Sequence, residues 1–215
     1  MELSLRHNFP DVLRDLDRLQ DEVAARALAS AVNRTMDQAQ TEMVRQIVGE
    51  FAVTRDYVKQ RMRIRRASYK AGVFNISATL AAGDGNKRRS ANIIAFVERS
   101  VSLAEGRRRA KAGTQRQLFV QVKRAGGKKP LADSFIGNKG RTVFHRVPGT
   151  TMASRSRYAG TKHAQEIAPT MTIDVPSMFN TKRLNKVVVQ KMLDKFPEVF
   201  EREARFYVAR FNASR

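Results

Sequence analysis

The chain has 215 residues, of which 41 are Lys or Arg and 20 are Asp or Glu, so it carries a net charge of +21 and contains no cysteine. This length allows one domain with a sizeable core or one domain with helical arms, and a hydrophobic content of 42% argues against a disordered chain. The lack of cysteine excludes disulfides and thiolate zinc sites, and it is typical of a reducing compartment.

The sequence predicts neither a signal peptide nor a membrane span. The first residues, MELSLRHNFPDVLRDL, are charged from the start and lack the apolar segment of a signal peptide. No run of eighteen apolar residues occurs. We therefore expect a protein that does not insert into membranes.

The positive charge is concentrated in the middle of the chain. Residues 51–165 hold 26 Lys or Arg against 5 Asp or Glu, whereas the two ends together hold 15 of each sign. The stretch 106–130 alone holds nine Lys or Arg and no acidic residue. A surplus of this size attracts polyanions, which predicts nucleic acid or an acidic protein surface as the partner. Solvated loops that keep the chain soluble are the alternative.

Residues 11–48 are predicted to form a long helix. Pro10 suits a first helical turn and Gly49 suits a helix end. The helix would measure about 55 Å at about 1.5 Å per residue, so it either breaks near residues 33–37 or packs on another subunit. Its apolar residues recur at steps of three and four: Val12, Leu16, Leu19, Val23, Ala27, Ala31, Val32, Met36, Ala39, Met43 and Ile47. The candidate oligomer contacts are Leu16, Leu19 and Val23.

Short elements follow this helix. Thr54 suits the N-cap of a short helix over 55–62, and the alternation in RIRRAS indicates the start of a strand. The apolar segments 71–82 and 91–102 are predicted strands, and the glycines in 83–90 indicate a loop between them.

The stretch 106–130 combines a strand with basic connectors. QLFVQV has the β-branched and aromatic character of a strand, and Gly-rich basic segments lie on both sides of it. SFIGNKGRTVFHRV (134–147) is a predicted hairpin, and the polar segment 148–167 is a predicted long loop. The candidate contacts to DNA or an acidic partner are Arg107, Arg108, Arg109, Lys111, Lys123, Arg124, Lys128 and Lys129.

The chain ends in a second helical region. Residues 170–178 are predicted to be extended up to Pro176, and residues 180–212 are predicted to be helical, with Pro197 kinking or splitting the helix. The expected fold is therefore α+β, with a long N-terminal helix, a central antiparallel β-sheet with basic loops and a kinked C-terminal helix. We expect one structural domain made of a helical arm (1–50), a basic β-rich core (51–178) and a C-terminal helix packed on that core (179–215).

The sequence offers little material for catalysis. His7, His145 and His163 are far apart and have no partners at metal-ligand spacing. The acidic residues of the basic region are isolated, whereas a nuclease needs carboxylates that hold a divalent metal. Phosphate-binding loops and nucleophile elbows are missing as well. We expect no enzymatic activity, no metal and no cofactor.

Four segments, in this order along the chain, carry a resemblance to a known family. AVNRTMDQAQTEMVRQIVGEFAVTRDYVKQRMRIRRAS (31–68), SFIGNKGRTVFHRV, IAPTMTIDVPSMF and LDKFPEVFEREARFYV resemble the phage lambda-type minor tail protein Z family. The second segment is similar to the family's hairpin, with Phe135 and Ile136 as its apolar pair and Gly140 as its turn glycine. Pro176 and Pro197 match prolines of the last two segments.

Two features depart from the family pattern. Asp133 and Ser134 stand where the family tends to have a small Gly-Ala pair, and the 148–167 loop is longer than usual. The resemblance covers about residues 28–211.

The resemblance implies a structural virion protein of a tailed phage or prophage, made in the host bacterial cytoplasm. Such a protein completes the tail at its head-proximal end and takes part in tail maturation and head–tail joining. Its implied partners are other tail and neck proteins, further copies of itself in a ring, and DNA in the lumen.

A sequence-nonspecific nucleic-acid-binding protein is the alternative function. The basic region has few aromatic residues that stack on bases, and it contains no helix-turn-helix or zinc-finger pattern. A tail protein whose basic loops meet phosphate or an acidic surface is the favoured interpretation.

Overall fold

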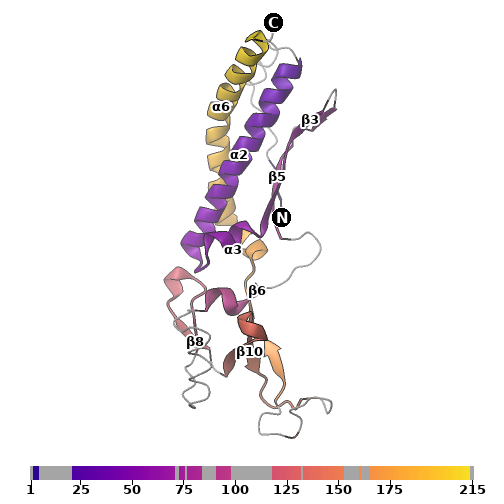
Figure 1. Ribbon diagram of the computed structural model, residues 1–215. Coiled ribbons are helices and arrows are strands. Elements are labelled where there is room, and N and C mark those ends of the chain that lie inside the picture. Colours follow the sequence, from indigo (N-terminus) through magenta and orange to yellow (C-terminus); the bar gives the residue numbers. More distant parts are fainter. Residues whose placement is uncertain are drawn as a thin grey trace. The chain divides into compact units, whose positions relative to one another are not determined.

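The structure is a computed structural model that describes residues 2–4, 21–70, 73–75, 77–83, 91–97, 118–131, 133–152, 160 and 165–213. The fold class is α+β, as the sequence predicts (Figure 1). Every strand pair among the described residues is antiparallel. The chain divides into two compact units: unit 1 comprises residues 1–48, 55–88 and 175–215, and unit 2 comprises residues 49–54 and 89–174. That the chain acts as one structural domain stays a prediction.

Both units are built from elements that are distant in the sequence. Unit 1 contains the helices α2 (Asp21–Glu50, whose last two residues belong to unit 2), α3 (Arg55–Lys59), α5 (Val175–Phe179) and α6 (Lys182–Ala213). Its strands are β1 (Glu2–Ser4), β2 (Met62–Arg65), β3 (Ser68–Lys70), β4 (Val73–Asn75) and β5 (Thr79–Ala82). Unit 2 contains β6 (Ala91–Asn92), η1 (Ile93–Phe96), β7 (Leu118–Val120), η2 (Arg124–Gly126), β8 (Lys129–Leu131), β9 (Ser134–Gly137), η3 (Asn138–Gly140), β10 (Thr142–Arg146), β11 (Ile167–Pro169) and β12 (Met171–Thr172).

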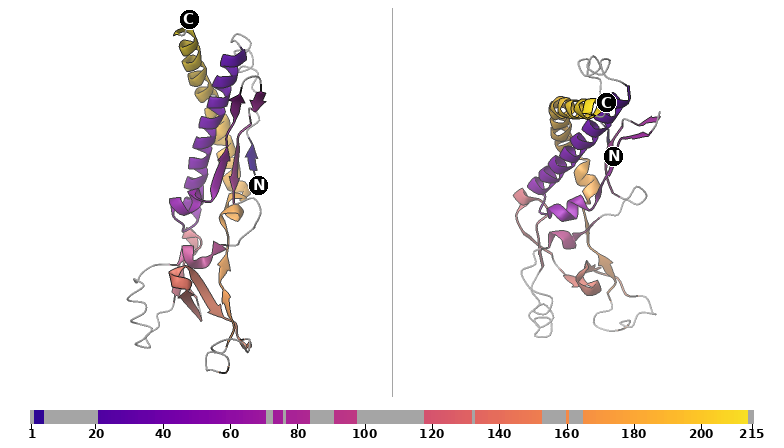
Figure 2. Two further views of the ribbon diagram at one scale, coloured as in Figure 1. Left: turned by 45° about the vertical axis from the view of Figure 1, so that its right-hand side comes forward. Right: turned by 45° about the horizontal axis from the view of Figure 1, so that its top comes forward.

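Helix α2 forms the core of unit 1. It runs unbroken through residues 33–37, and residues 11–20 of the predicted helix lie outside the described residues. Helix α6 and the sheet with strand order β1-β5-β2 lie alongside it (Figure 2). The side chains of α2 that are almost fully buried are Ala27, Ala31, Val32, Thr35, Met36, Met43 and Ile47. Those of α6 are Leu184, Val188, Met192, Phe196, Val199 and Phe200. Apolar burial of this kind is the main force that holds the unit together.

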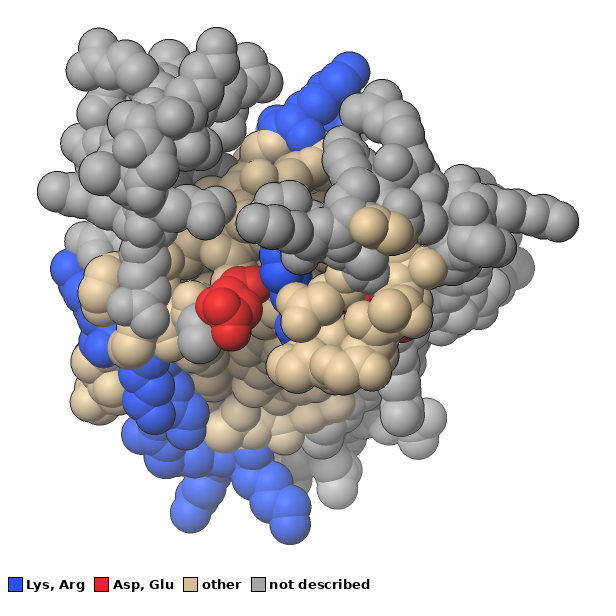
Figure 3. Space-filling view, turned by 90° about the horizontal axis from the view of Figure 1, so that it is seen from below, with Lys and Arg blue, Asp and Glu red and all other residues tan. Residues whose placement is uncertain are grey.

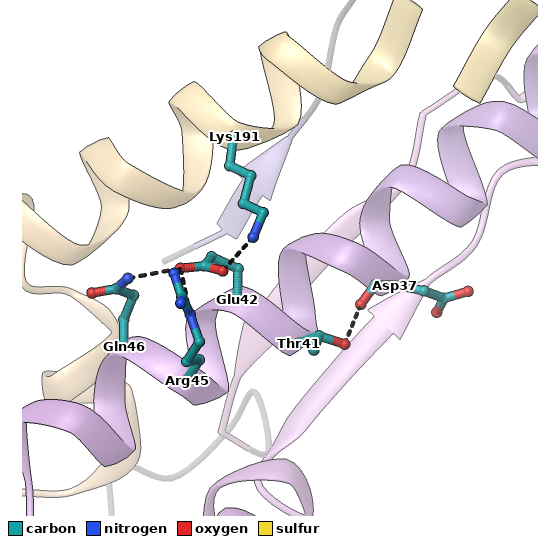
Figure 4. Close-up of polar contacts among 6 residues, drawn as sticks. All are labelled: Asp37, Thr41, Glu42, Arg45, Gln46 and Lys191. Atoms are coloured by element: carbon teal, nitrogen blue, oxygen red, sulfur yellow. Dashed lines mark hydrogen bonds and ion pairs between the residues drawn. The ribbon is translucent and has the colours of Figure 1, made fainter. Parts of the chain in front are cut away.

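A buried carboxylate connects the two long helices. Glu42 of α2 is 2% exposed and accepts hydrogen bonds from Arg45 and Gln46 of its own helix, both at 2.7 Å, and from Lys191 of α6 at 2.6 Å (Figure 4). Burial alone would raise the pKa of Glu42, but the hydrogen bonds from these three side chains outweigh it and lower the pKa to about 2. Glu42 is therefore ionised across the ordinary pH range.

A second buried carboxylate makes the reciprocal connection. Glu203 of α6 is 4% exposed, and it accepts a hydrogen bond from Ser30 at 2.8 Å and pairs with Arg34 Nε at 3.0 Å, both on α2. Each helix thus places one buried glutamate against cations or donors of the other. Because the pairs are 42 with 191 and 30 with 203, the two helices are antiparallel. These contacts fix the position of the two helices relative to each other along their axes.

Two side chains of α2 hold the end of β2. The amide of Asn33 donates to the carbonyl of Ala67 at 2.9 Å and accepts from its N–H at 2.8 Å. One turn later, Asp37 accepts two hydrogen bonds from the guanidinium of Arg66, at 2.8 and 3.0 Å. Such a two-bond pair has a defined geometry, so the strand end is fixed relative to the helix.

An asparagine side chain also organises unit 2. Asn92 accepts hydrogen bonds from the N–H groups of Ile94 at 3.1 Å and Val143 at 2.9 Å, and it donates to the carbonyl of Val143 at 3.1 Å. Val143 lies in β10, the central strand of the sheet β11-β10-β9, and is fully buried. The predicted strand over 91–102 is wrong in part: β6 ends at Asn92, because its side chain caps the N–H of Ile94 and begins the 3-10 turn η1.

Other expected elements are confirmed or corrected. The hairpin predicted over 134–147 is present as β9, η3 and β10. The extended piece over 170–178 is wrong beyond Thr172, because Val175–Phe179 forms α5, in which Pro176 occupies the first turn that tolerates it. Helix α6 is not split at Pro197; buried apolar residues on both sides of the proline hold the helix in place, among them Phe196, Val199 and Phe200.

Candidate polyanion-binding hairpin

The described half of the sequence-predicted cationic site lies in one hairpin of unit 2. Strands β7 and β8 pair antiparallel, and residues 118–131 are called the basic hairpin here. Four of the eight candidate contacts belong to it: Lys123, Arg124, Lys128 and Lys129. The other four, Arg107, Arg108, Arg109 and Lys111, lie outside the described residues.

The stem of the hairpin is attached to the core of unit 2 along one face. Val120 is 6% exposed and forms a bridge to Val97. The carbonyl of Val122 accepts a hydrogen bond from the N–H of Ala52 at 3.0 Å. The β-branched residues of QLFVQV therefore serve to anchor the strand, which leaves the turn beyond them exposed.

The turn of the hairpin carries the cations on a bent backbone. Gly126 N–H donates to the carbonyl of Lys123 at 3.0 Å, and Gln121 donates its amide hydrogen to the carbonyl of Arg124 at 2.8 Å. Gly127 has φ 67° and ψ 179°, a conformation that is essentially restricted to glycine. The sequence KRAGGKKP thus places two basic pairs on either side of a glycine-dependent bend.

All four basic side chains of the hairpin are exposed. Lys123 lies 3.7 Å from a carboxylate oxygen of Glu50, with 61% of its side chain exposed, so this ion pair contributes little to stability. In the space-filling view of Figure 3, Lys and Arg side chains project at several places on the face that is shown, and Asp and Glu are visible at few. Because its four basic side chains are exposed, the hairpin offers positive charge to a partner.

An exposed apolar pair lies in the stem beside these cations. Phe119 is 44% exposed and stands opposite Pro130, which is also exposed. Large aromatic side chains that remain exposed are typical anchors of protein interfaces. Sequence reasoning missed this pair; the signal was the alternation in LFVQV, which sends Val120 inward and Phe119 outward.

Outside the hairpin, the described residues include one of the three histidines considered as metal ligands. The ring nitrogen Nδ1 of His145 lies 3.0 Å from the hydroxyl of Thr170, which connects two segments of unit 2. Within the described part of the chain, acidic residues and histidines do not form a group that could hold a metal ion. The described helices are all too short or too polar to cross a membrane.

The candidate oligomer contacts are only partly described. Val23 belongs to α2 and is 8% exposed, so its side chain is already covered within the chain. Leu16 and Leu19 lie outside the described residues. An oligomer contact at the start of the predicted helix stays a prediction.

Comparison with known proteins identifies one family. The family model described as prophage minor tail protein Z (GPZ) matches residues 9–211. No curated protein and no solved structure matches the chain. The family match covers both units and the whole of the basic hairpin.

Proposed function

The chain belongs to the prophage minor tail protein Z family, and on that premise we propose that it completes the tail at its head-proximal end and is needed for tail maturation and head–tail joining. As a minor tail protein it is a structural component of the virion. The members of this family are structural tail proteins, so we expect no catalytic activity.

The basic hairpin is the observation that carries this proposal. It combines four exposed cations with the exposed Phe119 and Pro130, which together suit an acidic protein surface with an apolar recess. A tail-completion protein must dock on a neighbouring tail or neck protein, and this surface provides both the charge and the apolar anchor for such a contact.

We extend the proposal to a ring of identical subunits. Heterologous contacts between copies close into a ring when the rotation permits. Helix α6 supplies apolar surface for such contacts, because Val187, Val189 and Leu193 are 41%, 37% and 40% exposed. Sedimentation of the protein with Leu16→Asp and Leu19→Asp tests the other candidate contact, at the start of the predicted N-terminal helix. A shift from multimer to monomer is expected, and an unchanged multimer contradicts a contact at these positions.

Complementation of a phage that lacks this gene tests the main proposal. Without the protein, heads and tails should be made but should remain unjoined in electron micrographs, and infectivity should be lost. Normal infectivity of the deletion phage contradicts the proposal. The variant Lys128→Gln with Lys129→Gln should restore infectivity poorly. The matched control, Lys182→Gln with Lys186→Gln on exposed positions of α6, removes the same charge and should restore it fully.

The alternative of a sequence-nonspecific nucleic-acid-binding hairpin predicts a different result. Micromolar or tighter DNA affinity at physiological salt that is lost in Lys128→Gln with Lys129→Gln favours DNA as the hairpin's partner. DNA binding that this variant leaves unchanged, together with failed joining, supports the acidic protein neighbour.

A further inference from the structure

A second cationic surface lies in unit 1, on the edge strand β2. Along this strand burial alternates: Met62 faces the core, whereas Arg63 and Arg65 are exposed on the opposite face. Arg61 precedes them at the same spacing and is exposed as well. Because a strand rises about 3.4 Å per residue, Arg63 and Arg65 follow one another at about 6.8 Å, and Arg61 lies in the turn just before the strand. All three arginines are exposed. They are called the arginine row here.

The arginine row has a fixed support. Its first member, Arg61, lies 3.7 Å from the centre of the Tyr57 ring and donates to the carbonyl of Tyr57 at 3.1 Å. Its far end is followed by Arg66 and Ala67, which Asp37 and Asn33 of α2 hold by two hydrogen bonds each. Arg66 is thus matched by a carboxylate of α2. The strand between these two points has little freedom to change direction.

The strand beside the row presents small residues. In the register of β2 with β5, Arg63 stands opposite Ala81 and Arg65 opposite Thr79. Gly83 N–H donates to the carbonyl of Arg61 at 2.8 Å, so Gly83 lies beside Arg61 in the same way. The line formed by Thr79, Ala81 and Gly83 is called the lane here. Among residues 52–69 and 77–83, whose side-chain exposure the structure describes, no large apolar side chain is exposed. On the far strand, Glu2 stands in register with Ala81 and adds one acidic position at the edge of this face.

The arginines and the small residues beside them indicate which chemical group the row binds. A guanidinium fork suits phosphate and forms two parallel hydrogen bonds with it, and all three members of the row are arginine rather than lysine. A protein partner draws much of its affinity from apolar anchors, and the side chains that the structure describes on this face offer none. A single-stranded nucleic acid stacks its bases on aromatic side chains, and the lane of Thr79, Ala81 and Gly83 offers none. A DNA duplex keeps its bases stacked inside and presents phosphates.

We propose that the arginine row binds the phosphodiester backbone of duplex DNA without regard to base sequence. The contacts are made to phosphates, which position the protein on the duplex but carry no sequence information. This surface is separate in the chain from the basic hairpin, and the proposal does not depend on what the hairpin binds.

The test measures the salt dependence of DNA binding by the full-length protein. Fluorescence anisotropy with two unrelated duplexes of about 20 base pairs gives the affinity at several salt concentrations. Each phosphate contact contributes about 0.9 to the slope of log affinity against log salt. The variant Arg63→Gln with Arg65→Gln should therefore lower the slope by about 1.8, and by the same amount for both duplexes.

Two further variants serve as controls. Arg183→Gln with Arg210→Gln, at exposed positions of α6, removes the same charge and should leave the slope unchanged. Arg63→Lys with Arg65→Lys keeps the charge and should keep most of the slope, while the loss of the guanidinium fork weakens binding. Circular dichroism verifies that all variants are folded.

Several outcomes overturn the proposal. The proposal is wrong if the wild-type protein does not bind the duplexes. It is also wrong if the slope of log affinity against log salt falls by the same amount in the row variant and in the α6 variant. A slope that depends on Lys128 and Lys129 but not on the row assigns DNA binding to the hairpin instead. Binding of poly-glutamate that is lost in the row variant, with DNA binding retained, assigns the row to an acidic protein. None of these results bears on head–tail joining, which the complementation assay measures separately.

Discussion

The basic hairpin of unit 2 and the arginine row of unit 1 present the same kind of charge on different supports. The hairpin carries its cations on a turn that depends on Gly127, next to the exposed Phe119. The row is part of a strand whose end is tied to α2 by Asn33 and Asp37, and the lane beside it is made of small residues. Net charge alone does not identify a partner, whereas the apolar surface and the rigidity beside the charge do.

The two units also differ in how they use acidic residues. In unit 1, Glu42 and Glu203 are buried and pair across α2 and α6. In unit 2, Glu50 pairs with the largely exposed Lys123 at 3.7 Å. The buried carboxylates of Glu42 and Glu203 depend on their hydrogen-bond donors, because water hardly reaches them, whereas water replaces a lost partner at the surface. Stability should therefore depend on charge in unit 1 far more than in unit 2.

The largest effect is expected from Glu42→Gln. Only the carboxylate of Glu42 is buried, while Lys191 and Arg45 are 45% and 65% exposed, so the loss of unfolding free energy should be about 3 kcal/mol, the lower end for a buried pair. Lys123→Gln should cost less than about 1 kcal/mol. Hydrogen exchange with a mass-spectrometric readout reports each unit by itself and measures both variants. Losses of equal size in the two variants would contradict the contrast between the units.

Acidification should destabilise unit 1 through the same residue. The pKa of Glu42 is about 2 in the folded protein against an ordinary value of 4.5, so the folded state favours the charged form. Its stabilisation is complete above pH 4.5, is lost as the pH falls from 4.5 to 2, and amounts to about 3 kcal/mol. Thermal unfolding between these pH values, followed by circular dichroism, measures it.

The variant Glu42→Gln is the control for this acid dependence. The exposed Glu198, whose pKa is lowered by its hydrogen bond from Lys195, changes stability in the same direction and is unaffected by the substitution. Most of the pH dependence should therefore disappear in the variant. A pH profile as steep as that of the wild type would rule out Glu42 as its source.

The smallest effect concerns the turn of the basic hairpin. Gly127→Ala forces a side chain into a backbone region with φ 67°, which costs about 1–3 kcal/mol locally, although the added methyl group would meet no neighbour. Gly126→Ala is the matched control, because its backbone has no positive φ and its new contact, 3.7 Å from Lys123, is ordinary. The measurement is hydrogen exchange over residues 118–131 together with complementation.

The expected result is faster exchange and weaker complementation for Gly127→Ala alone. Similar behaviour of the two glycine variants would show that the turn conformation does not matter for docking. In that case the hairpin and the arginine row would differ in their apolar neighbours but not in the importance of their backbone.

Elements whose residue pattern is local can be predicted from the sequence. Apolar steps of three and four placed the two long helices, because one helix face repeats at that period. Turn residues placed the 134–147 hairpin, where Lys139 takes a positive φ. The alternation in RIRRAS likewise indicated β2. These signals arise from neighbours within a few positions, so they survive without knowledge of the fold.

Tertiary structure alone decided the contacts between distant residues. Glu42 meets Lys191 and Glu203 meets Ser30 across 149 and 173 positions, and nothing near any of these residues in the sequence marks its partner. Packing on both sides of Pro197 kept α6 in one piece, and the three hydrogen bonds of Asn92 ended a strand that apolar composition favoured. The number of basic residues follows from the sequence, but which of them are exposed depends on how the strands pack.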